Sequence, residues 1–322
     1  MMPPETAMIP PLETLRAAYA RVKPYIHRTP LLRSASLSKL TGHDVYFKAE
    51  MLQKTGSFKP RGMTNRLLQL SPEEKKRGAI TFSAGNMAQG LAYGAAIAGI
   101  KAVVVMPAAA SPLKAAATRS YGAEVILHGD VTEAYQHCMA LIEKHRYVFA
   151  RFDDQHIMEG HASLALEILE DLPDLDAVVY PIGGGGLIGG AVMALRAAGS
   201  KAKIIGIEPE NADVMRLSLE AGKAVRSPPR PTIADGLAPP FAGERCFPLV
   251  RDHAEGITLV SEAQLGDAIK LLLTRMKLLA EGAGAASLAG LVHGKLPLKP
   301  GSKVVCVLSG GNIDPERLKT VL

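Results

Sequence analysis

Two patterns of hydrophobic and polar positions alternate along the chain. Short apolar runs typical of buried strands are separated by longer stretches with apolar residues three and four apart, as in amphipathic helices. The runs predict strands at residues 45–48, 79–82, 101–106, 124–127, 147–150, 177–180, 204–207 and 304–308. The longer stretches predict helices at residues 86–98, 112–121, 131–145, 162–171, 187–196 and 262–279. This alternation predicts an α/β fold with parallel sheets that helices cover on both faces.

Three segments break the pattern. The Pro-rich first ten residues are expected to be irregular, and residues 226–243, with several prolines, are expected to be extended. Residues 66–78 form a polar connection that could mark a crossing between domains.

Composition narrows the class of protein. With 322 residues the chain is long enough for two domains, each with its own core. The net charge is +6, but the basic residues are spread evenly, which argues against a nucleic-acid partner. No apolar run approaches the roughly 20 residues that cross a bilayer, so no membrane partner is expected.

The cysteines and the N-terminus indicate a reducing compartment. Cys138, Cys246 and Cys306 lie far apart, a spacing that fits neither a disulfide framework nor a zinc site. The first residues carry no basic and apolar leader, so we expect a cytoplasmic protein. The sequence ends at Leu322, and no C-terminal regulatory domain is expected.

The run of four glycines, Gly183, Gly184, Gly185 and Gly186, is the most informative single feature. It follows an apolar run and precedes a helical pattern that begins at Leu187. Glycines allow backbone N–H groups to converge, and a helix N-terminus adds partial positive charge. The run therefore predicts a phosphate site.

Two kinds of phosphorylated ligand fit this segment. Gly184, Gly186 and Gly189 match the G-x-G-x-x-G pattern of dinucleotide-binding folds, and Glu208 follows at the distance of a ribose-binding acid. That pattern normally opens its domain, whereas here more than half of the chain precedes it. A cup around a single phosphate fits equally well, and the segment alone does not decide.

Three other predicted turns carry reactive groups. Lys59 lies in the Ser- and Gly-rich turn 55–62 before a helical stretch, where lost solvation would favour an amine nucleophile. Residues 83–90 form a strand-to-helix turn with Asn86, suited to binding a carboxylate. Ser309 follows the last predicted strand. Ligands of open parallel sheets bind where strands release their carboxyl ends, so we expect these turns to converge.

Taken together, the four segments resemble the pyridoxal-phosphate enzymes of the tryptophan synthase β-like fold (fold type II), and within them the serine/threonine dehydratase and serine racemase family. The resemblance covers nearly the whole chain from His27 and is carried by the motifs Ser57-Phe58-Lys59-Pro60-Arg61-Gly62, Ser83-Ala84-Gly85-Asn86, Gly183-Gly184-Gly185-Gly186-Leu187 and Ser309-Gly310-Gly311-Asn312. It implies two open twisted parallel-sheet domains with pyridoxal 5'-phosphate in the cleft between them. Residues 1–66 and 151–322 would form the large cofactor-binding domain, and residues 67–150 the small domain that grips the substrate.

The resemblance also implies roles for single residues. Lys59 would carry the cofactor as a Schiff base and then remove the substrate α-proton. The other cofactor-binding residues would be Phe58, Asn86, Gly183, Gly184, Gly185, Gly186, Leu187, Gly236, Glu281 and Ser309. The substrate would be bound by Ser83, Ala84, Gly85, Asn86 and Met87.

Departures from the family pattern refine the expected reaction. Racemases of this family carry a second Ser where this chain has Ala84, which argues against racemisation. Met87 replaces the usual His, and the run 159–163, expected at a helix start close to the site, also differs. Family members often bind a divalent cation. Glu208 and Ala212 match two of its ligands, but Val214 replaces the second acid, which counts against a metal.

The resemblance therefore implies a lyase that eliminates water from L-threonine, L-serine or a related β-hydroxy amino acid, giving a 2-keto acid and ammonia. It further implies a homodimer or a higher homo-oligomer. The alternatives are a racemase, a β-replacement enzyme, an NAD-dependent oxidoreductase and a binding protein without turnover. Pro60 counts against β-replacement, because those enzymes carry Asn there.

Overall fold

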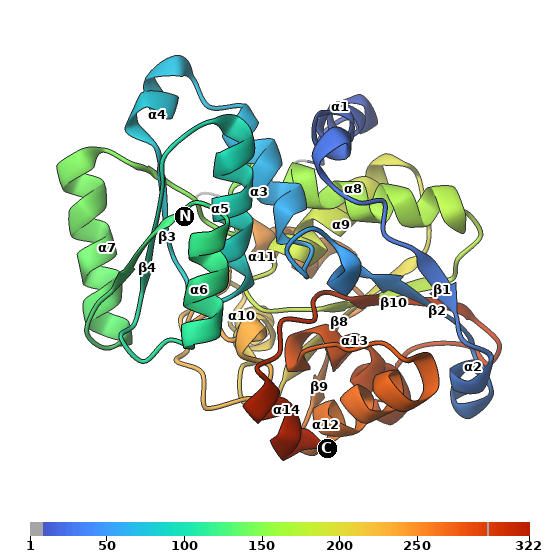
Figure 1. The fold of residues 1–322 in the computed structure, drawn as a ribbon. Coiled ribbons are helices and arrows are strands. Elements are labelled where there is room, and N and C mark those ends of the chain that lie inside the picture. Colours follow the sequence, from blue (N-terminus) through green and yellow to red (C-terminus); the bar gives the residue numbers. More distant parts are fainter. Residues whose placement is uncertain (1–8, 295) are drawn as a thin grey trace.

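The computed structural model describes residues 9–294 and 296–322, and its elements form two mostly parallel sheets with helices around them (Figure 1). Residues 1–8 of the Pro-rich segment lie outside this range. The strands are β1 (Leu31–Arg33), β2 (Asp44–Ala49), β3 (Ala79–Phe82), β4 (Ala102–Met106), β5 (Glu124–Leu127), β6 (Val148–Phe149), β7 (Ala177–Pro181), β8 (Lys203–Pro209), β9 (Ile257–Val260) and β10 (Lys303–Leu308).

Helices occupy most of the remaining sequence. They are α1 (Leu12–Val22), α2 (Ala35–Thr41), α3 (Lys59–Leu68), α4 (Pro72–Arg77), α5 (Asn86–Ala98), α6 (Pro112–Ser120), α7 (Val131–His145), α8 (Gln155–Asp171), α9 (Gly186–Ala197), α10 (Val214–Ala221), α11 (Cys246–His253), α12 (Glu262–Leu271), α13 (Gly282–His293) and α14 (Pro315–Val321). Short helical turns are η1 (Lys23–Tyr25), η2 (Glu50–Leu52), η3 (Asp235–Leu237) and η4 (Leu272–Met276). Among the described residues no helix is long and apolar enough to cross a membrane.

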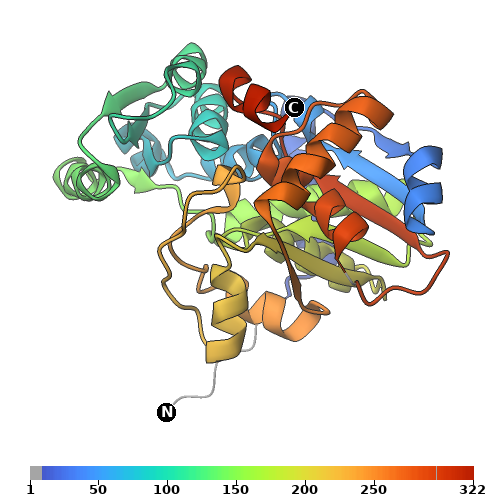
Figure 2. The same ribbon diagram turned by 90° about the horizontal axis from the view of Figure 1, so that it is seen from below.

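The larger sheet has the strand order β1-β2-β10-β7-β8-β9. All neighbours are parallel except the pair β1–β2. Successive residues of a strand point to opposite faces, so Val178 and Tyr180 of β7 enter one core while Ala177 and Val179 enter the other. Helices α1, α8 and α9 cover the first face and α12 and α13 the second (Figures 1 and 2).

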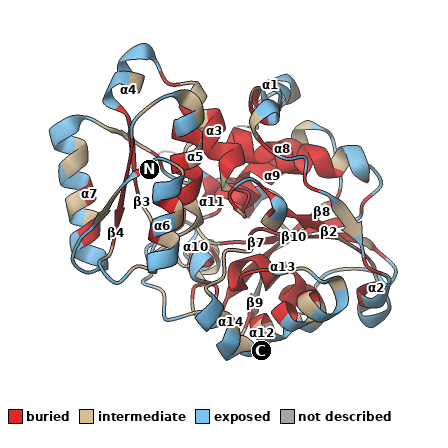
Figure 3. Cartoon of the chain, in the orientation of Figure 1, coloured by how far each residue is buried: buried red, intermediate tan, exposed pale blue. Residues whose placement is uncertain are grey.

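The smaller sheet has the order β5-β4-β3-β6 and is wholly parallel. Helix α5, blue-green in Figure 1, packs on one face and α7, green, on the other. Every strand of this sheet lies inside the segment 67–150 expected for the small domain, and the boundary itself stays a prediction. Buried residues concentrate on β4, β7, β8 and β10 and in helices α3, α8, α9 and α13 (Figure 3).

The predicted fold class is confirmed, and several boundaries are corrected. The expected polar connection 66–78 contains the end of α3 and all of α4, which a capping box at Ser71 and Glu74 begins. Helix α8 begins at Gln155 rather than at residue 162, because Asp154 accepts hydrogen bonds from its first amides. Helix α12 ends at Leu271 and continues as the wider turn η4 instead of reaching residue 279.

Candidate active site

Four loops with reactive groups leave the carboxyl ends of strands, as the sequence predicts. The turn before Lys59 follows β2, the Asn86 loop follows β3, the glycine run follows β7 and Ser309 follows β10. Contacts link the lysine turn, the Asn86 loop and the β10 loop, as the next paragraphs describe. The structure therefore brings the predicted residues of these three loops together, while their roles remain predictions.

Lys59 is the first residue of α3, and its neighbours desolvate it. A Cβ at Gly90 of α5 would lie 2.7 Å from the Lys59 Cβ, so only glycine lets α5 approach this closely. The amine lies 4.6 Å from the centre of the Phe58 ring. Burial lowers the pKa of Lys59 to about 8, against the opposing pull of the Glu281 carboxylate. A neutral, nucleophilic amine is thus accessible near neutral pH.

The lysine turn is joined to the end of β10. The backbone N–H of Phe58 donates to the Ser309 carbonyl oxygen at 3.1 Å, and Ser57 pairs with Gly310 in a β-bridge. The Ser309 side chain is 4% exposed, and its hydroxyl donates to the Ala283 carbonyl at 3.4 Å. The amine and the hydroxyl therefore sit on one connected backbone unit.

Asn86 takes part in a chain of hydrogen bonds across the site. Its Nδ2 donates to Glu281 Oε1 at 2.5 Å, and its Oδ1 accepts from Asn312 Nδ2 at 2.7 Å. The same Asn312 nitrogen donates to the Thr55 carbonyl oxygen at 2.7 Å. This chain links the Asn86 loop to α13, to the β10 loop and to the lysine turn.

Glu281 lies at the start of α13 and is 3% exposed. Burial, helped by the Asp235 carboxylate, raises its pKa to about 7. Gly236 lies beside it, since a Cβ there would be 3.9 Å from Glu281 Oε1 and 3.1 Å from the Ala283 Cβ. The predicted neighbours Gly236 and Glu281 are thus brought together.

The glycine run forms a close-packed turn at the start of α9. Gly185 has a φ of +97°, and a Cβ there would lie 2.7 Å from the Cys246 Cβ. A Cβ at Gly184 would fall 2.1 Å from the Phe152 ring, and one at Gly186 would fall 2.3 Å from the Phe152 carbonyl oxygen. The run therefore tolerates no side chain at these positions.

The backbone donors of this turn are free. Among the described residues, no backbone carbonyl accepts a hydrogen bond from the N–H groups of residues 183–187. Converging free N–H groups at a helix N-terminus match an anion. Because Lys59 and Ser309 also lie on segments joined by the Phe58–Ser309 hydrogen bond, the residues present fit a phosphorylated aldehyde cofactor.

The expected substrate loop, residues 83–87, lies at the N-terminal end of α5. Its residues Ser83, Ala84, Gly85, Asn86 and Met87 are all partly exposed. The Ser83 hydroxyl accepts from the Gly85 N–H at 3.2 Å, which shapes the turn. Ala84 and Met87 pack against the core of the smaller sheet, and neither side chain carries a hydrogen-bond donor.

A buried ionic cluster lies behind the lysine turn. Arg61, fully buried, donates to Glu50 Oε2 and Glu167 Oε1, both at 2.8 Å. Lys48 Nζ lies 2.6 Å from Glu167 Oε2. Two positive and two negative side chains balance one another in the interior, which is the condition for burying such charges. The cluster anchors α3, and hence Lys59, to β2 and α8.

Two expectations about Glu208 do not match its surroundings. Its carboxylate is buried and accepts from the N–H groups of Met215 and Arg216, both at 2.9 Å, so it caps α10. The Ala212 N–H donates to Pro209 in the preceding turn. Over residues 9–294 and 296–322 no group of three His, Cys, Asp or Glu side chains could hold a metal ion. Neither the cation site nor the ribose-binding role is supported here.

The unusual run 159–163 lies inside α8 rather than at a helix start. His161 of this run is buried, and its ring meets the Phe58 ring edge at 4.7 Å between centroids. Burial, with Lys59 and Arg61 nearby, lowers the pKa of His161 well below its usual value. The run is thus close to the lysine turn, as expected, and it packs against this turn through the contact of His161 with Phe58.

Three neighbours of the site were not predicted from the sequence. Asn312 directly follows the recognised glycines of the last loop, so its position was a usable signal. Phe152 and Cys246 pack beneath the glycine run. No local pattern marks them, because they reach the run from distant segments.

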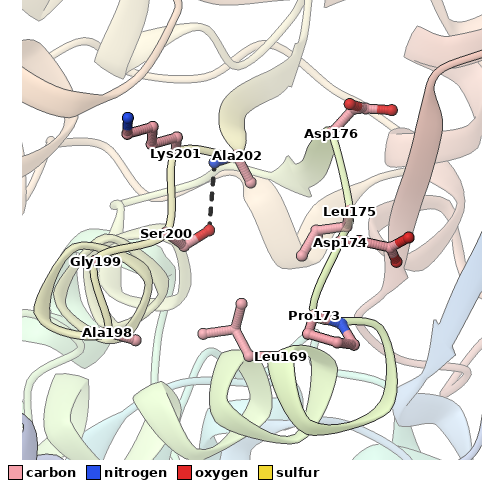
Figure 4. Close-up of a pocket in the computed structure, with 10 residues that line it drawn as sticks. All are labelled: Leu169, Pro173, Asp174, Leu175, Asp176, Ala198, Gly199, Ser200, Lys201 and Ala202. Carbon is pink, nitrogen blue, oxygen red and sulfur yellow. Dashed lines mark hydrogen bonds between the residues drawn. The ribbon is translucent and has the colours of Figure 1, made fainter.

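A separate pocket of about 570 Å³ opens at the opposite end of the strands of the larger sheet (Figure 4). Residues that precede β7 and β8 line it, among them Asp174, Asp176, Ser200 and Lys201. It therefore lies at the amino ends of these strands, whereas the candidate site lies at their carboxyl ends.

Comparisons with known proteins agree with this geometry. The family described as "pyridoxal-phosphate dependent enzyme" matches residues 22–310. The L-threonine ammonia-lyase of Thermotoga maritima is 44% identical over 97% of this chain and 78% of its own length. A catabolic L-threonine dehydratase of Staphylococcus aureus is 40% identical over 99% of this chain and 93% of its own.

Solved structures share the fold. The threonine deaminase of T.th. superposes with a TM-score of 0.88 at 42% identity, covering 95% of this chain and 99% of that one. Maize serine racemase superposes with a TM-score of 0.91 at 32% identity, covering 97% of both chains. The predicted tryptophan synthase β-like fold is therefore confirmed, and the chain belongs to the family of pyridoxal-phosphate-dependent enzymes.

Proposed function

We propose that this chain is an ammonia-lyase that converts L-threonine to 2-oxobutanoate and ammonia, with L-serine as a second substrate. The observation that carries the proposal is the placement of a desolvated Lys59 amine on the same backbone unit as the buried Ser309 hydroxyl, in a chain 40–44% identical to threonine ammonia-lyases and dehydratases. Water is first eliminated from the substrate and later added back, so the net products are one keto acid and one ammonia.

Pyridoxal phosphate, when bound, supplies an electron sink for the electrons left at the substrate α-carbon. The free N–H groups of residues 183–187 would hold its phosphate, with Phe58 against the ring. Asn86 would donate to the ring oxygen, and Glu281 and Gly236 would line the same side. Ser309 would face the ring nitrogen.

The protein's own groups would then handle the proton. Lys59, with its pKa lowered to about 8, would link to the cofactor and afterwards take the α-proton of the substrate. The turn from Ser83 to Met87 would bind the substrate carboxylate. A hydroxyl rather than a carboxylate at position 309 would leave the ring nitrogen unprotonated, which favours prompt loss of the β-hydroxyl over return of the proton.

Ala84 separates this proposal from racemisation. The side chain has no proton to give on the face opposite Lys59, so a substrate that loses its α-proton would not regain one there. The fold itself does not discriminate, since maize serine racemase shares it.

The test is a screen of purified protein with L-threonine, L-serine and D-serine, measuring ammonia and keto acid. We expect keto acid and ammonia in equal amounts from L-threonine, with slower release from L-serine. Formation of D-serine from L-serine without keto acid would replace the proposal by a racemase. If a yellow, cofactor-loaded protein forms neither keto acid nor D-serine, the family assignment stands but the proposed lyase activity is refuted.

We also infer a cytoplasmic homo-oligomer, a dimer or larger. Cys138, Cys246 and Cys306 are free and buried, which suits a reducing compartment. The oligomer follows from the family resemblance, and light scattering after size-exclusion chromatography tests it. A monomer at micromolar concentration would refute it.

A further inference from the structure

Asn312 connects three loops of the site with a single amide nitrogen. This side chain lies three residues beyond Ser309, between β10 and α14. Its Nδ2 donates to the Thr55 carbonyl oxygen of the lysine turn and to Asn86 Oδ1, both at 2.7 Å. Both of its N–H groups are therefore used inside the site.

The orientation of the Asn312 amide is determined by chemistry. A backbone carbonyl such as that of Thr55 only accepts hydrogen bonds, so the amide nitrogen and not the oxygen must face it. The same nitrogen then requires an acceptor on its other side, which is Asn86 Oδ1. The nitrogen of Asn86 must in turn face the Glu281 carboxylate, at 2.5 Å.

The result is a row of donors that all point the same way. Asn312 donates a hydrogen bond to Asn86, and Asn86 donates one to Glu281. Without Asn312, only the bond to Glu281 would hold the Asn86 amide in this orientation, since amide oxygen and nitrogen have nearly the same shape.

The backbone around Asn312 packs closely against its side chain. Gly56 has a φ of +69°, and a Cβ there would lie 2.5 Å from Asn312 Oδ1. The Gly311 N–H donates to the Gly56 carbonyl at 2.9 Å, which joins the two loops directly beside the side chain. The Asn312 amide is thus held in place before any ligand arrives.

We propose that Asn312 is a positioning residue that sets the Asn86 amide so that its N–H, and not its oxygen, is offered to the cofactor ring. An oxygen of the ring that carries negative charge needs such a donor, and it would be repelled by the amide oxygen. The inference rests on the role proposed for Asn86 in the previous subsection. It requires cofactor binding but not the identity of the substrate.

The substitution Asn312→Asp tests this with almost no change of shape. A carboxylate can only accept, so it would repel the Thr55 carbonyl and accept from Asn86 only after that amide had turned over. We expect the affinity for pyridoxal phosphate to fall by about tenfold or more, the loss of roughly one hydrogen bond to a charged acceptor. We also expect a shift in the absorption maximum of the bound cofactor and in its pH dependence. Asn312→Ala removes the donor without adding charge, so its cofactor affinity is expected to lie between those of the parent and Asn312→Asp.

Asn211→Asp is the matched control. Asn211 also donates to a backbone carbonyl, that of Pro231 at 2.9 Å, but it lies outside the site. We expect this variant to keep the parent's cofactor affinity and spectrum. Circular dichroism and the thermal unfolding midpoint of each variant identify any general loss of structure.

A double-mutant cycle with Asn86→Ala separates positioning from a structural role. If Asn312 acts through Asn86, Asn312→Ala should cost no further cofactor affinity in the Asn86→Ala background. Additive losses in the cycle, or an unchanged spectrum and affinity in folded Asn312→Asp and Asn312→Ala, would overturn the proposal. If Asn312→Asp does not fold, Asn312→Ala and the cycle still decide. A parent protein that binds the cofactor but releases no ammonia would refute the proposed reaction and leave this test intact.

Discussion

Phe58 donates its backbone N–H to the carbonyl oxygen of Ser309 at 3.1 Å. The bond joins the residue next to the reactive lysine to the residue proposed to face the ring nitrogen, although 251 positions separate them along the chain. Since the same two segments are also bridged between Ser57 and Gly310, the backbones that carry the amine and the hydroxyl are held side by side. Such pre-organisation lowers the conformational cost of binding one ligand with both groups.

Ser309→Ala tests the contribution of the hydroxyl. The side chain is buried and makes only a long hydrogen bond, at 3.4 Å, to the Ala283 carbonyl. We expect the fold to persist and cofactor affinity to fall by about tenfold, corresponding to ~1.4 kcal/mol for one hydrogen bond to the ring nitrogen. Fluorescence titration of cofactor-free protein measures this, and unchanged affinity would contradict the placement of Ser309.

Gly185→Ala tests the glycine turn. A Cβ there would lie 2.7 Å from both the Cys246 Cβ and the Met215 Cε, and the φ of +97° is strained for alanine. We expect a loss of stability of about 2–4 kcal/mol and a loss of phosphate affinity, because the free N–H groups are displaced. Gly222→Ala is the control, since Gly222 has a φ of +67° but no atom within 4 Å of the added Cβ. If both variants lower the thermal unfolding midpoint equally and keep the cofactor affinity, the glycine turn does not bind the phosphate.

Glu281 is expected to make stability depend on pH. Its pKa is raised from 4.5 to about 7, so the folded protein binds a proton in this range that the unfolded chain does not. The stabilising contribution is complete below pH 4.5 and is lost as the pH rises through 7. Glu281→Gln keeps an oxygen that accepts from Asn86 and removes the titration.

We therefore expect the stability of Glu281→Gln relative to the parent to increase between pH 4.5 and 7 and to stay constant above. The increase is at most about 3 kcal/mol. Thermal unfolding of both proteins, freed of cofactor, at several pH values measures it. A difference that is the same at every pH would mean that Glu281 titrates normally.

The buried cluster behind the lysine turn is expected to be indispensable for stability. Glu167→Gln leaves Arg61 and Lys48 with only Glu50 as a buried counter-charge, which costs about 3–5 kcal/mol. Glu316→Gln, which removes an exposed ion pair with Lys319, is the control and is expected to cost about 0–1 kcal/mol. Thermal unfolding compares the two, and similar midpoints would contradict the account of the cluster.

The parts of the fold that repeat a local pattern were predictable from the sequence. Helices α5 and α7 begin and end where the apolar spacing predicts, and β3 and β5 match to the residue. Strand β1 was missed because it has only three residues, two partly exposed and one exposed, which give no periodic signal. The missed strand β9 has little buried surface, since three of its four residues are only partly buried.

The candidate site was predictable where one loop carries its own chemistry. Lys59, Asn86, Ser309 and the glycine run each stand in a strand-to-helix turn and could be read without the fold. Residues that pack behind these loops could not be predicted, because their partners are distant along the sequence. Phe152 meets Gly184 only after the chain has folded, and the burial of Arg61 with Glu167 depends on α3 lying against α8.

Trapping the cofactor with borohydride tests whether Lys59 carries it. The protein is loaded with pyridoxal phosphate, reduced with borohydride and digested, and the modified peptide is identified by mass spectrometry. We expect one phosphopyridoxyl group per chain, on Lys59, and none on the exposed Lys54, which directly precedes the turn. A protein that takes up no label, or one that carries it on another lysine, would contradict this expectation.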